Sequence, residues 1–237
     1  MHLRSVQCAH MRLRAAVIGL AMTTLSACVP TASQAPSAIF PSPSAVTTES
    51  STASSVSASG SVVVSERLQS GGILEIGNAD ASTSLTLFIN HSSDYSQQFM
   101  QTLVPQLITD FVWRGQLRLE IVPLALKKYP QSDVSAALML CAAKQGKGRA
   151  INDLLFGNTN AAQLQKEMTS MGLKVDQLQA CMKSDELRTM LDAEKKLAAS
   201  YTITLVPSYL LGNRIFTGLP EYADLRGQVN QTIAGTR

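Results

Sequence analysis

The stretch "SLTLFINHSSDYSQQF", residues Ser84 to Phe99, determines how this chain is interpreted. Its first half, which ends at Asn90, is rich in β-forming residues and bounded by polar ones, a pattern that predicts a strand. Apolar residues then recur at helical spacing, at Phe99, Leu103, Leu107 and Phe111. A strand therefore leads into a helix through a turn rich in hydroxyl groups.

The regions on either side of this unit predict further strands and helices. "ILEIG" before it and "QLRLEIVPL" after it have the composition or alternation of strands, and Pro105 is expected to kink the helix between them without ending it. Residues 132–200 show helical patterns, with breaks expected near 146–148, 157–160 and 172. "TITLVPSYLLGNRIFTG" predicts two strands joined by a turn at Gly212-Asn213, and "EYADLRGQVNQTIAG" predicts a closing helix.

The 237 residues, 45% of them hydrophobic, suffice for one domain with a core and some additional segments. The formal charge of +3 does not indicate nucleic-acid binding, because Arg4, Arg12 and Arg14 all precede Cys28 and no acidic residue does. Removing that region leaves 17 basic residues against 17 acidic ones. We therefore expect no nucleic-acid partner.

Residues 1–27 have the pattern of an export signal. Two arginines precede a short apolar run and small residues, and the run is too short to span a bilayer. The ending "LSAC", Leu25 to Cys28, resembles a bacterial lipobox, which implies a lipid on Cys28 and a membrane anchor in the cell envelope. In a Gram-negative cell, Val29 after that cysteine implies sorting to the outer membrane. A cleaved, soluble secreted protein is the alternative, and Met11 is an alternative start to Met1.

Residues 28–65 are expected to form a disordered tether. They are dominated by Ser, Thr, Ala, Pro and Val, and Glu49 is their only charged residue. Such a composition buries too little apolar surface to offset the entropy of ordering. A flexible chain of this length reaches about 35 Å, so it would serve as a spacer between a membrane and a folded domain at 66–237.

The order strand, helix, strand, helical block, two strands, helix resembles the thioredoxin arrangement with the helical insertion of DsbA-like proteins. The resemblance runs from about Ile76 to Ile233. The insertion motifs have counterparts in "CAAKQGK" (Cys141 to Lys147) and "LQACM" (Leu178 to Met182), and the second-half motif in "TITLVPSYLLGN". The resemblance implies an α/β, thioredoxin-like fold with a helical insertion.

In this resemblance Ser93 and Ser96 occupy the two catalytic cysteine positions of the family, with Asp94 and Tyr95 between them. Thiol–disulfide exchange needs a thiolate and a second thiol, which serine hydroxyls do not supply. We therefore expect the fold without the redox reaction, and no catalytic residue at this turn. Ser93 or Asp94 is expected to cap the helix. The alternative is a hydrolytic nucleophile, Ser93 with His91 as its base, although His91 is expected on the surface.

Val206 and Pro207 stand at the family's cis-proline position, which implies a groove where an extended peptide adds as a strand. Tyr95 and Tyr209 would line this groove or be partly buried, and Pro207 would alternatively only shape the turn into the next strand. Cys141 and Cys181, the remaining thiols of an exported domain, are expected to form a structural disulfide, with two free buried thiols as the alternative. No metal or cofactor is expected, because the cysteine spacing and the absence of a His cluster do not fit a zinc site.

Three functions remain open at this point. The first is a lipid-anchored, redox-inactive module that binds extended polypeptide or a partner protein in the envelope, facing the periplasm or the exterior. The second is an enzyme, either a thiol-disulfide oxidoreductase of the DsbA family that uses Cys141 or Cys181, or a hydrolase. The third is a purely structural envelope lipoprotein.

Overall fold

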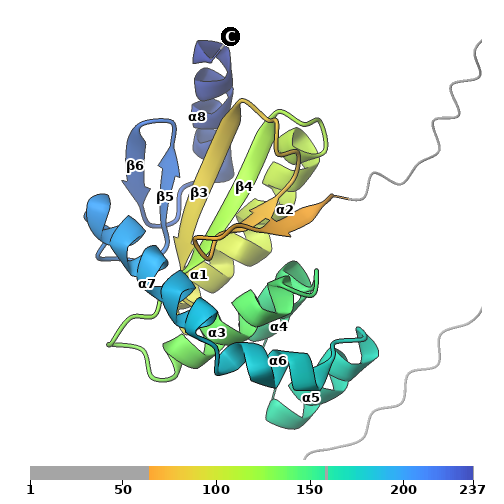
Figure 1. The fold of residues 1–237 in the computed structure, drawn as a ribbon. Coiled ribbons are helices and arrows are strands. Elements are labelled where there is room, and N and C mark those ends of the chain that lie inside the picture. The colour runs from red at the N-terminus through yellow and green to blue at the C-terminus, as the bar shows by residue number, and fades with distance from the viewer. Residues whose placement is uncertain (1–63, 158–159, 237) are drawn as a thin grey trace, which may run out of the picture. The chain divides into compact units, whose positions relative to one another are not determined.

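A computed structural model describes residues 64–157 and 160–236. The expected signal at 1–27, the lipidation site at Cys28 and almost all of the tether lie outside these residues. The described part is built on one mixed sheet in the order β1-β2-β4-β3-β5-β6 (Figure 1). Its strands are β1 (Glu66–Leu68), β2 (Leu74–Ile76), β3 (Thr83–Ile89), β4 (Leu117–Pro123), β5 (Ser208–Leu211) and β6 (Arg214–Thr217). The first of them, β1, is a three-residue edge strand that the sequence patterns did not predict.

Only β3 and β4 run parallel, and all the other neighbouring strands are antiparallel. A parallel pair requires a crossover connection, and the helix predicted after Ser93 provides it. Both strands therefore end at the same edge of the sheet. The turn at Asn90 and the segment after Pro123 consequently lie side by side, and the Leu124 N–H donates to the Ile89 carbonyl at 2.8 Å.

The crossover helix consists of four consecutive segments: α1 (Asp94–Gln98), η1 (Phe99–Leu103), α2 (Val104–Leu107) and η2 (Ile108–Val112). It continues through Pro105, as expected, but η1 and η2 are π-helical. The Val104 N–H donates to the Phe99 carbonyl, five residues back. Proline lacks an N–H and its ring crowds the carbonyl four residues earlier, so a wider turn beside Pro105 relieves the conflict.

The main core lies on one face of the sheet, where the crossover helix and α8 (Tyr222–Gly235) cover it. Figure 1 shows these helices on one side of the strands and the inserted helices gathered at the lower end of the sheet. The inward-facing residues alternate along the central strands, as the strand period requires. They are Leu85, Leu87 and Ile89 of β3 and Leu117, Leu119 and Ile121 of β4.

The helical insertion consists of α3 (Ser132–Ala143), α4 (Gly148–Phe156), α5 (Ala161–Ser170), α6 (Val175–Met182) and α7 (Asp185–Ser200). Three of its breaks fall where the sequence predicted them. The fourth, between α6 and α7, was not predicted. There Ser184 caps α7 by accepting a hydrogen bond from the Leu187 N–H at 3.2 Å. A second core cluster, centred on α3, holds the insertion together.

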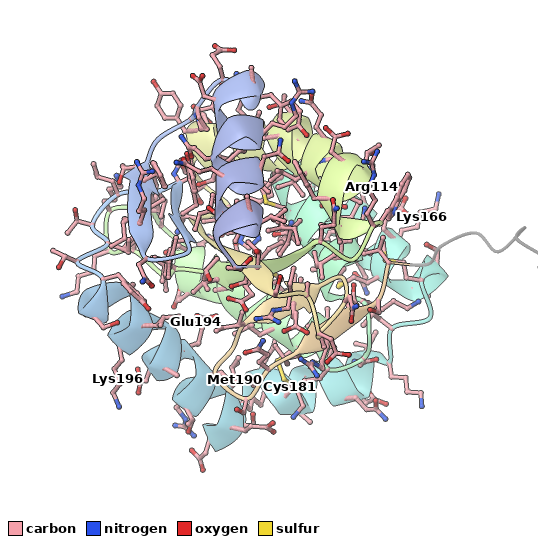
Figure 2. The ribbon with its side chains drawn as sticks, turned by 90° about the horizontal axis from the view of Figure 1, so that it is seen from above. Arg114, Lys166, Cys181, Met190, Glu194 and Lys196 are labelled. Carbon is pink, nitrogen blue, oxygen red and sulfur yellow. A yellow bond between two sulfur atoms is a disulfide. The ribbon has the colours of Figure 1, made fainter. Side chains whose placement is uncertain are left out.

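The helix α7 buries a carboxylate between apolar neighbours. Met190, Glu194 and Ala198 share the inward side of this helix, and Glu194 is 1% exposed. Figure 2 marks Glu194 and Met190 on this helix, with Lys196 extending outward. The carboxylate lies against Gly72, and its Oε1 has no hydrogen-bond partner among the described residues. Burial raises the pKa of Glu194 well above its usual value, an effect that the nearby Lys195 opposes.

Glu194→Gln is expected to raise the free energy of unfolding above pH 7 by about 1–3 kcal/mol, because a neutral amide avoids the extra cost of burying an ionised carboxylate. Because the folded pKa is raised, the native state binds more protons than the unfolded state above pH 4.5. Wild-type stability therefore declines as the pH rises from that value, and the variant lacks this decline. Urea unfolding at acid and alkaline pH measures the difference. Glu186→Gln, on the exposed side of α7, is the control, and equal pH slopes in wild type and Glu194→Gln contradict the expectation.

Candidate functional site

The candidate site begins at the turn between β3 and α1. Ser93 is the N-cap of α1, with φ −105° and ψ 116°, and its Oγ accepts a hydrogen bond from the Ser96 N–H at 3.3 Å. The expectation of a helix cap is therefore confirmed for Ser93, while Asp94 is the first residue of the helix. At this position the hydroxyl satisfies a backbone donor that the helix leaves unpaired.

The second serine of the turn points inward. Ser96 is fully buried, and its Oγ accepts from the Asn90 N–H at 3.3 Å. The Asn90 side chain accepts from the Ser92 N–H at 2.9 Å and donates to the Leu124 carbonyl at 2.6 Å. The turn is thus fixed on both sides by hydrogen bonds. Both serine hydroxyls stabilise the backbone, and neither is presented to a substrate as a nucleophile.

The expectation that His91 lies on the surface is only partly met, because its side chain is half-buried. Its ring packs on Phe156, with centroids 4.8 Å apart, and its Nε2 lies 3.1 Å from Asn152 Oδ1. Both partners belong to α4, more than 60 positions along the chain, so no local pattern indicated the contact. Burial lowers the pKa of His91 to about 4, and the Asn152 hydrogen bond only partly offsets this. His91 makes no hydrogen bond to Ser93 among the described residues, so the structure does not assemble the Ser–His pair of the hydrolase alternative.

His91 should make the domain sensitive to acid. Because its folded pKa of about 4 lies below the ordinary 6.5, the unfolded state binds more protons between these values. The contribution of neutral His91 to the free energy of unfolding is fully present above pH 6.5. The free energy of unfolding should fall by about 2–3 kcal/mol as the pH drops to 4. His91→Gln keeps a polar partner for Asn152 and should flatten this decline. Urea unfolding across this range tests it, and an imidazole that titrates near 6.5 by NMR in the folded protein contradicts it.

The outer side of the turn is apolar and accessible. Tyr95 is 65% exposed on the first turn of α1. Leu205, 54% exposed, precedes the Val206-Pro207 peptide bond, which is cis. The antiparallel register pairs Phe88 with Ser208, and continuing it places Pro207 opposite Ile89, at the end of β3 near the turn. These residues therefore belong to the same edge of the sheet.

The backbone of Val206 is unpaired among the described residues at this edge, and the residue as a whole is 9% exposed. Within the part of the chain that the structure describes, neither its N–H nor its C=O has a hydrogen-bond partner. The next carbonyl is occupied, because Pro207 accepts from the Gly218 N–H at 2.8 Å. We call Tyr95, Leu205 and the Val206 backbone the groove surface. Tyr209 is not part of it, since its ring is 2% exposed between Phe99 and Phe216 in the main core.

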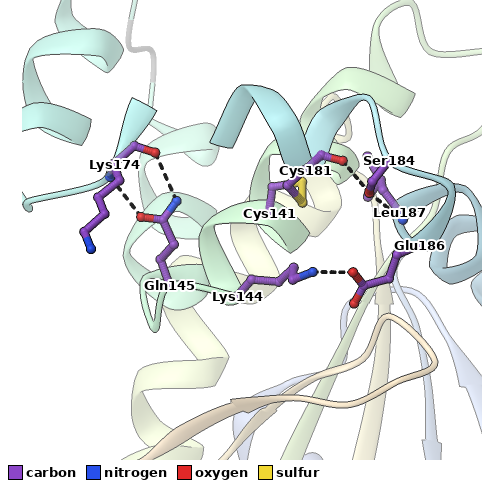
Figure 3. The surroundings of a disulfide bond; sticks show 8 residues. All are labelled: Cys141, Lys144, Gln145, Lys174, Cys181, Ser184, Glu186 and Leu187. Carbon is purple, nitrogen blue, oxygen red and sulfur yellow. Dashed lines mark hydrogen bonds and ion pairs between the residues drawn. A yellow bond between two sulfur atoms is a disulfide. The ribbon is translucent and has the colours of Figure 1, made fainter. Parts of the chain in front are cut away.

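Cys141 of α3 and Cys181 of α6 form a disulfide, with their Cα atoms 5.7 Å apart (Figure 3). Cys141 is fully buried and Cys181 half-buried, beside a pocket of about 400 Å³. Polar pairs flank the bond on both sides. Lys144 contacts Glu186, and the Gln145 side chain bonds both the N–H and the C=O of Lys174.

The described residues contain no cluster of three or more His, Cys, Asp or Glu side chains that could hold a metal ion. None of the helices in the same residues is both long and apolar enough to cross a membrane.

The sheet order, the crossover helix and the inserted helices define a DsbA-like thioredoxin fold. It carries serines at the two positions where the expected resemblance places cysteines. A family model described as "Thioredoxin" matches residues 69–231, and the chain belongs to this family. No relative was found among the curated proteins.

Solved structures support the same fold. The chain is similar to the thiol-disulfide exchange protein α-DsbA2 from Wolbachia pipientis, with 16% identity, 66% of this chain and 85% of that chain covered, and a TM-score of 0.59. A periplasmic thioredoxin-like protein from Salmonella enterica serovar Typhimurium is 14% identical to this chain. The match covers 69% of this chain and 91% of that chain, with a TM-score of 0.58. Oxidised BdbD from Bacillus subtilis is 15% identical to this chain. The match covers 73% of this chain and 98% of that chain, with a TM-score of 0.62.

Proposed function

We propose that this protein is an exported, lipid-anchored, redox-inactive DsbA-like domain that holds an extended polypeptide segment of an envelope protein. The segment binds at the groove surface, and no covalent chemistry takes place. The signal pattern before Cys28 supports export and anchoring, and the periplasmic location of the similar Salmonella protein agrees with export.

The unpaired backbone of Val206 is the observation that carries this proposal. A free N–H and C=O at the end of a strand pair naturally with the backbone of an extended segment, which gives affinity without reading its sequence. Tyr95 and Leu205 supply exposed apolar surface around this backbone. An unpaired backbone flanked by accessible apolar side chains favours an extended, partly apolar segment over a small polar ligand.

The absence of redox activity follows from the two serines. Ser93 and Ser96 engage backbone amides, and a hydroxyl there forms no mixed disulfide. Cys141 and Cys181, the only cysteines among the described residues, are joined to each other. No free thiol therefore lies in the described part of the chain to begin an exchange reaction.

A second candidate is an oxidoreductase that uses the Cys141–Cys181 bond itself. The half-buried Cys181 beside a pocket favours it, because access is one requirement of exchange. The two candidates differ in an insulin-reduction assay with dithiothreitol. Turnover above the buffer blank that disappears in Cys141→Ala establishes the oxidoreductase, whereas wild-type turnover equal to the blank excludes it.

Truncating the groove surface should weaken polypeptide binding. For the full chain and a permanently unfolded probe, reduced and carboxymethylated lactalbumin, Tyr95→Ala and Leu205→Ala are each expected to raise Kd about tenfold. Val175→Ala, which truncates an exposed apolar residue on α6, is the matched control and should leave Kd unchanged. Fluorescence anisotropy of the labelled probe measures all three. Absence of binding by the wild type contradicts the proposal, and together with insulin turnover equal to the blank it leaves the purely structural lipoprotein.

A further inference from the structure

The crossover helix ends in an exposed aromatic residue. Trp113, the only tryptophan of the chain, follows η2 directly and is 52% exposed. Tryptophan is mostly buried in folded proteins, and when exposed it favours boundaries where its ring lies in an apolar layer and its N–H in a wet one. The membrane–water interface is such a boundary.

Two exposed arginines accompany it. A pocket of about 310 Å³ is lined by Arg114, Arg226 of α8, Asp110, Asn230 and Phe111. Neither arginine makes a hydrogen bond or an ion pair within residues 64–157 and 160–236. The Asp110 carboxylate accepts a hydrogen bond from the Tyr222 hydroxyl at 2.6 Å. Figure 2 shows Arg114 at the edge of the molecule. Two guanidinium groups at one pocket that make no hydrogen bond or ion pair within the described residues fit phosphate oxygens, which guanidinium groups bind in a bidentate manner.

The described chain begins one contact away from the residue that precedes this tryptophan. Ser65 exchanges two hydrogen bonds of 2.9 Å with Gly77. Gly77 in turn packs on Val112, so closely that a Cβ atom on Gly77 would lie 2.7 Å from Val112 Cγ1. Val112 immediately precedes Trp113. The 63 residues before Val64, which include the proposed lipidation site at Cys28, therefore connect to the domain at the same end as Trp113.

We propose that Trp113, Arg114 and Arg226 form a docking surface for the phosphate-bearing face of an anionic lipid bilayer. The indole enters the interface, and the two guanidinium groups bind lipid phosphates. This surface is distinct from the groove surface. Trp113 precedes the first residue of β4, whereas the groove surface lies at the other end of its parallel partner β3, about 20 Å away along the strands. Docking directs the groove surface away from the membrane.

Trp113 is also the reporter that tests the proposal. The full chain is mixed with vesicles of phosphatidylcholine, with or without phosphatidylglycerol, that contain brominated lipid tails. On the anionic vesicles the Trp113 emission should shift to shorter wavelength and be quenched, and high salt should reverse both changes. The double variant Arg114→Gln with Arg226→Gln should lower the equilibrium constant for docking, measured by Trp113 quenching, about 30-fold.

Lys127→Gln with Lys128→Gln is the matched control. It removes the same charge from exposed residues beyond the opposite end of β4 and keeps the N-terminus and Trp113 unchanged, so quenching should persist. Equal loss of quenching in both double variants, or no quenching in wild type, overturns the proposal. A parallel titration with inorganic phosphate tests whether the two arginines bind a free phosphate anion instead of lipid phosphates. A response to inorganic phosphate without quenching by vesicles assigns the pocket to a free anion and also overturns the proposal.

Discussion

Cys141→Ala together with Cys181→Ala is expected to lower the free energy of unfolding by about 4 kcal/mol. The bond closes a loop with a sequence separation of 40 residues, and the chain-entropy estimate for a loop of that length gives this magnitude. Typical domains have a total stability of about 5–15 kcal/mol, so the loss is a large share. Urea unfolding of wild type and double variant measures it directly.

The loss should be concentrated in the insertion. Helix α5 has no buried residue and α6 only Leu178, so apolar burial alone holds these two helices weakly. Besides the disulfide, the Gln145–Lys174 hydrogen bonds connect the start of α6 to the end of α3. Without the bond, residues 161–182 should open before the sheet does. Hydrogen exchange should show lost protection there and little change in β3.

Two results contradict this expectation. One is a stability change below about 1 kcal/mol, which indicates that the unfolded state is not constrained by the bond. The other is free alkylation of both thiols in wild-type protein purified under native conditions, measured by intact mass. Reduced, alkylated wild type is the control for the Ala substitutions, because it removes the bond while retaining both sulfur atoms.

Ser93→Cys together with Ser96→Cys is expected to give the chain insulin-reducing activity above that of the wild type. The Ser93 Oγ already accepts the Ser96 N–H at the start of α1, so a sulfur at position 93 occupies the helix N-terminus, where thiolates are stabilised. Its pKa should fall from about 8.5 into the range of roughly 3.5–7.5 seen for such thiols. Thiolate absorbance against pH and insulin turnover are the two measurements.

Ser92→Cys is the control for this experiment. Ser92 is exposed and does not cap the helix, so a thiol there should keep a pKa near 8.5 and give no turnover. Ser93 itself is only 4% exposed, which should slow attack on a large substrate, so a small disulfide such as oxidised glutathione is tested alongside insulin. A double variant that forms no disulfide and has an ordinary thiol pKa contradicts the thioredoxin-like placement of this turn.

The sequence by itself determined the strand–helix unit around Ser93, the division of the insertion at its glycines and the order of elements that indicated the fold. These features depend on residues close together in the chain, where periodicity and capping preferences act directly. The same order of elements placed Ser93 and Ser96 at the two cysteine positions of the family. The expectation of lost thiol chemistry followed from that placement.

Only the tertiary structure decided the environment of individual side chains. His91 is held by α4, Tyr209 is enclosed by Phe99 and Phe216, and Glu194 is covered by the β1–β2 turn. In each case the partners come from elements far away in sequence or lie on a face that the local pattern leaves undefined. The unpaired backbone of Val206 likewise exists only because the sheet ends beside it. Burial, pKa and access depend on these long-range contacts, and hydrophobic periodicity within one segment does not encode them.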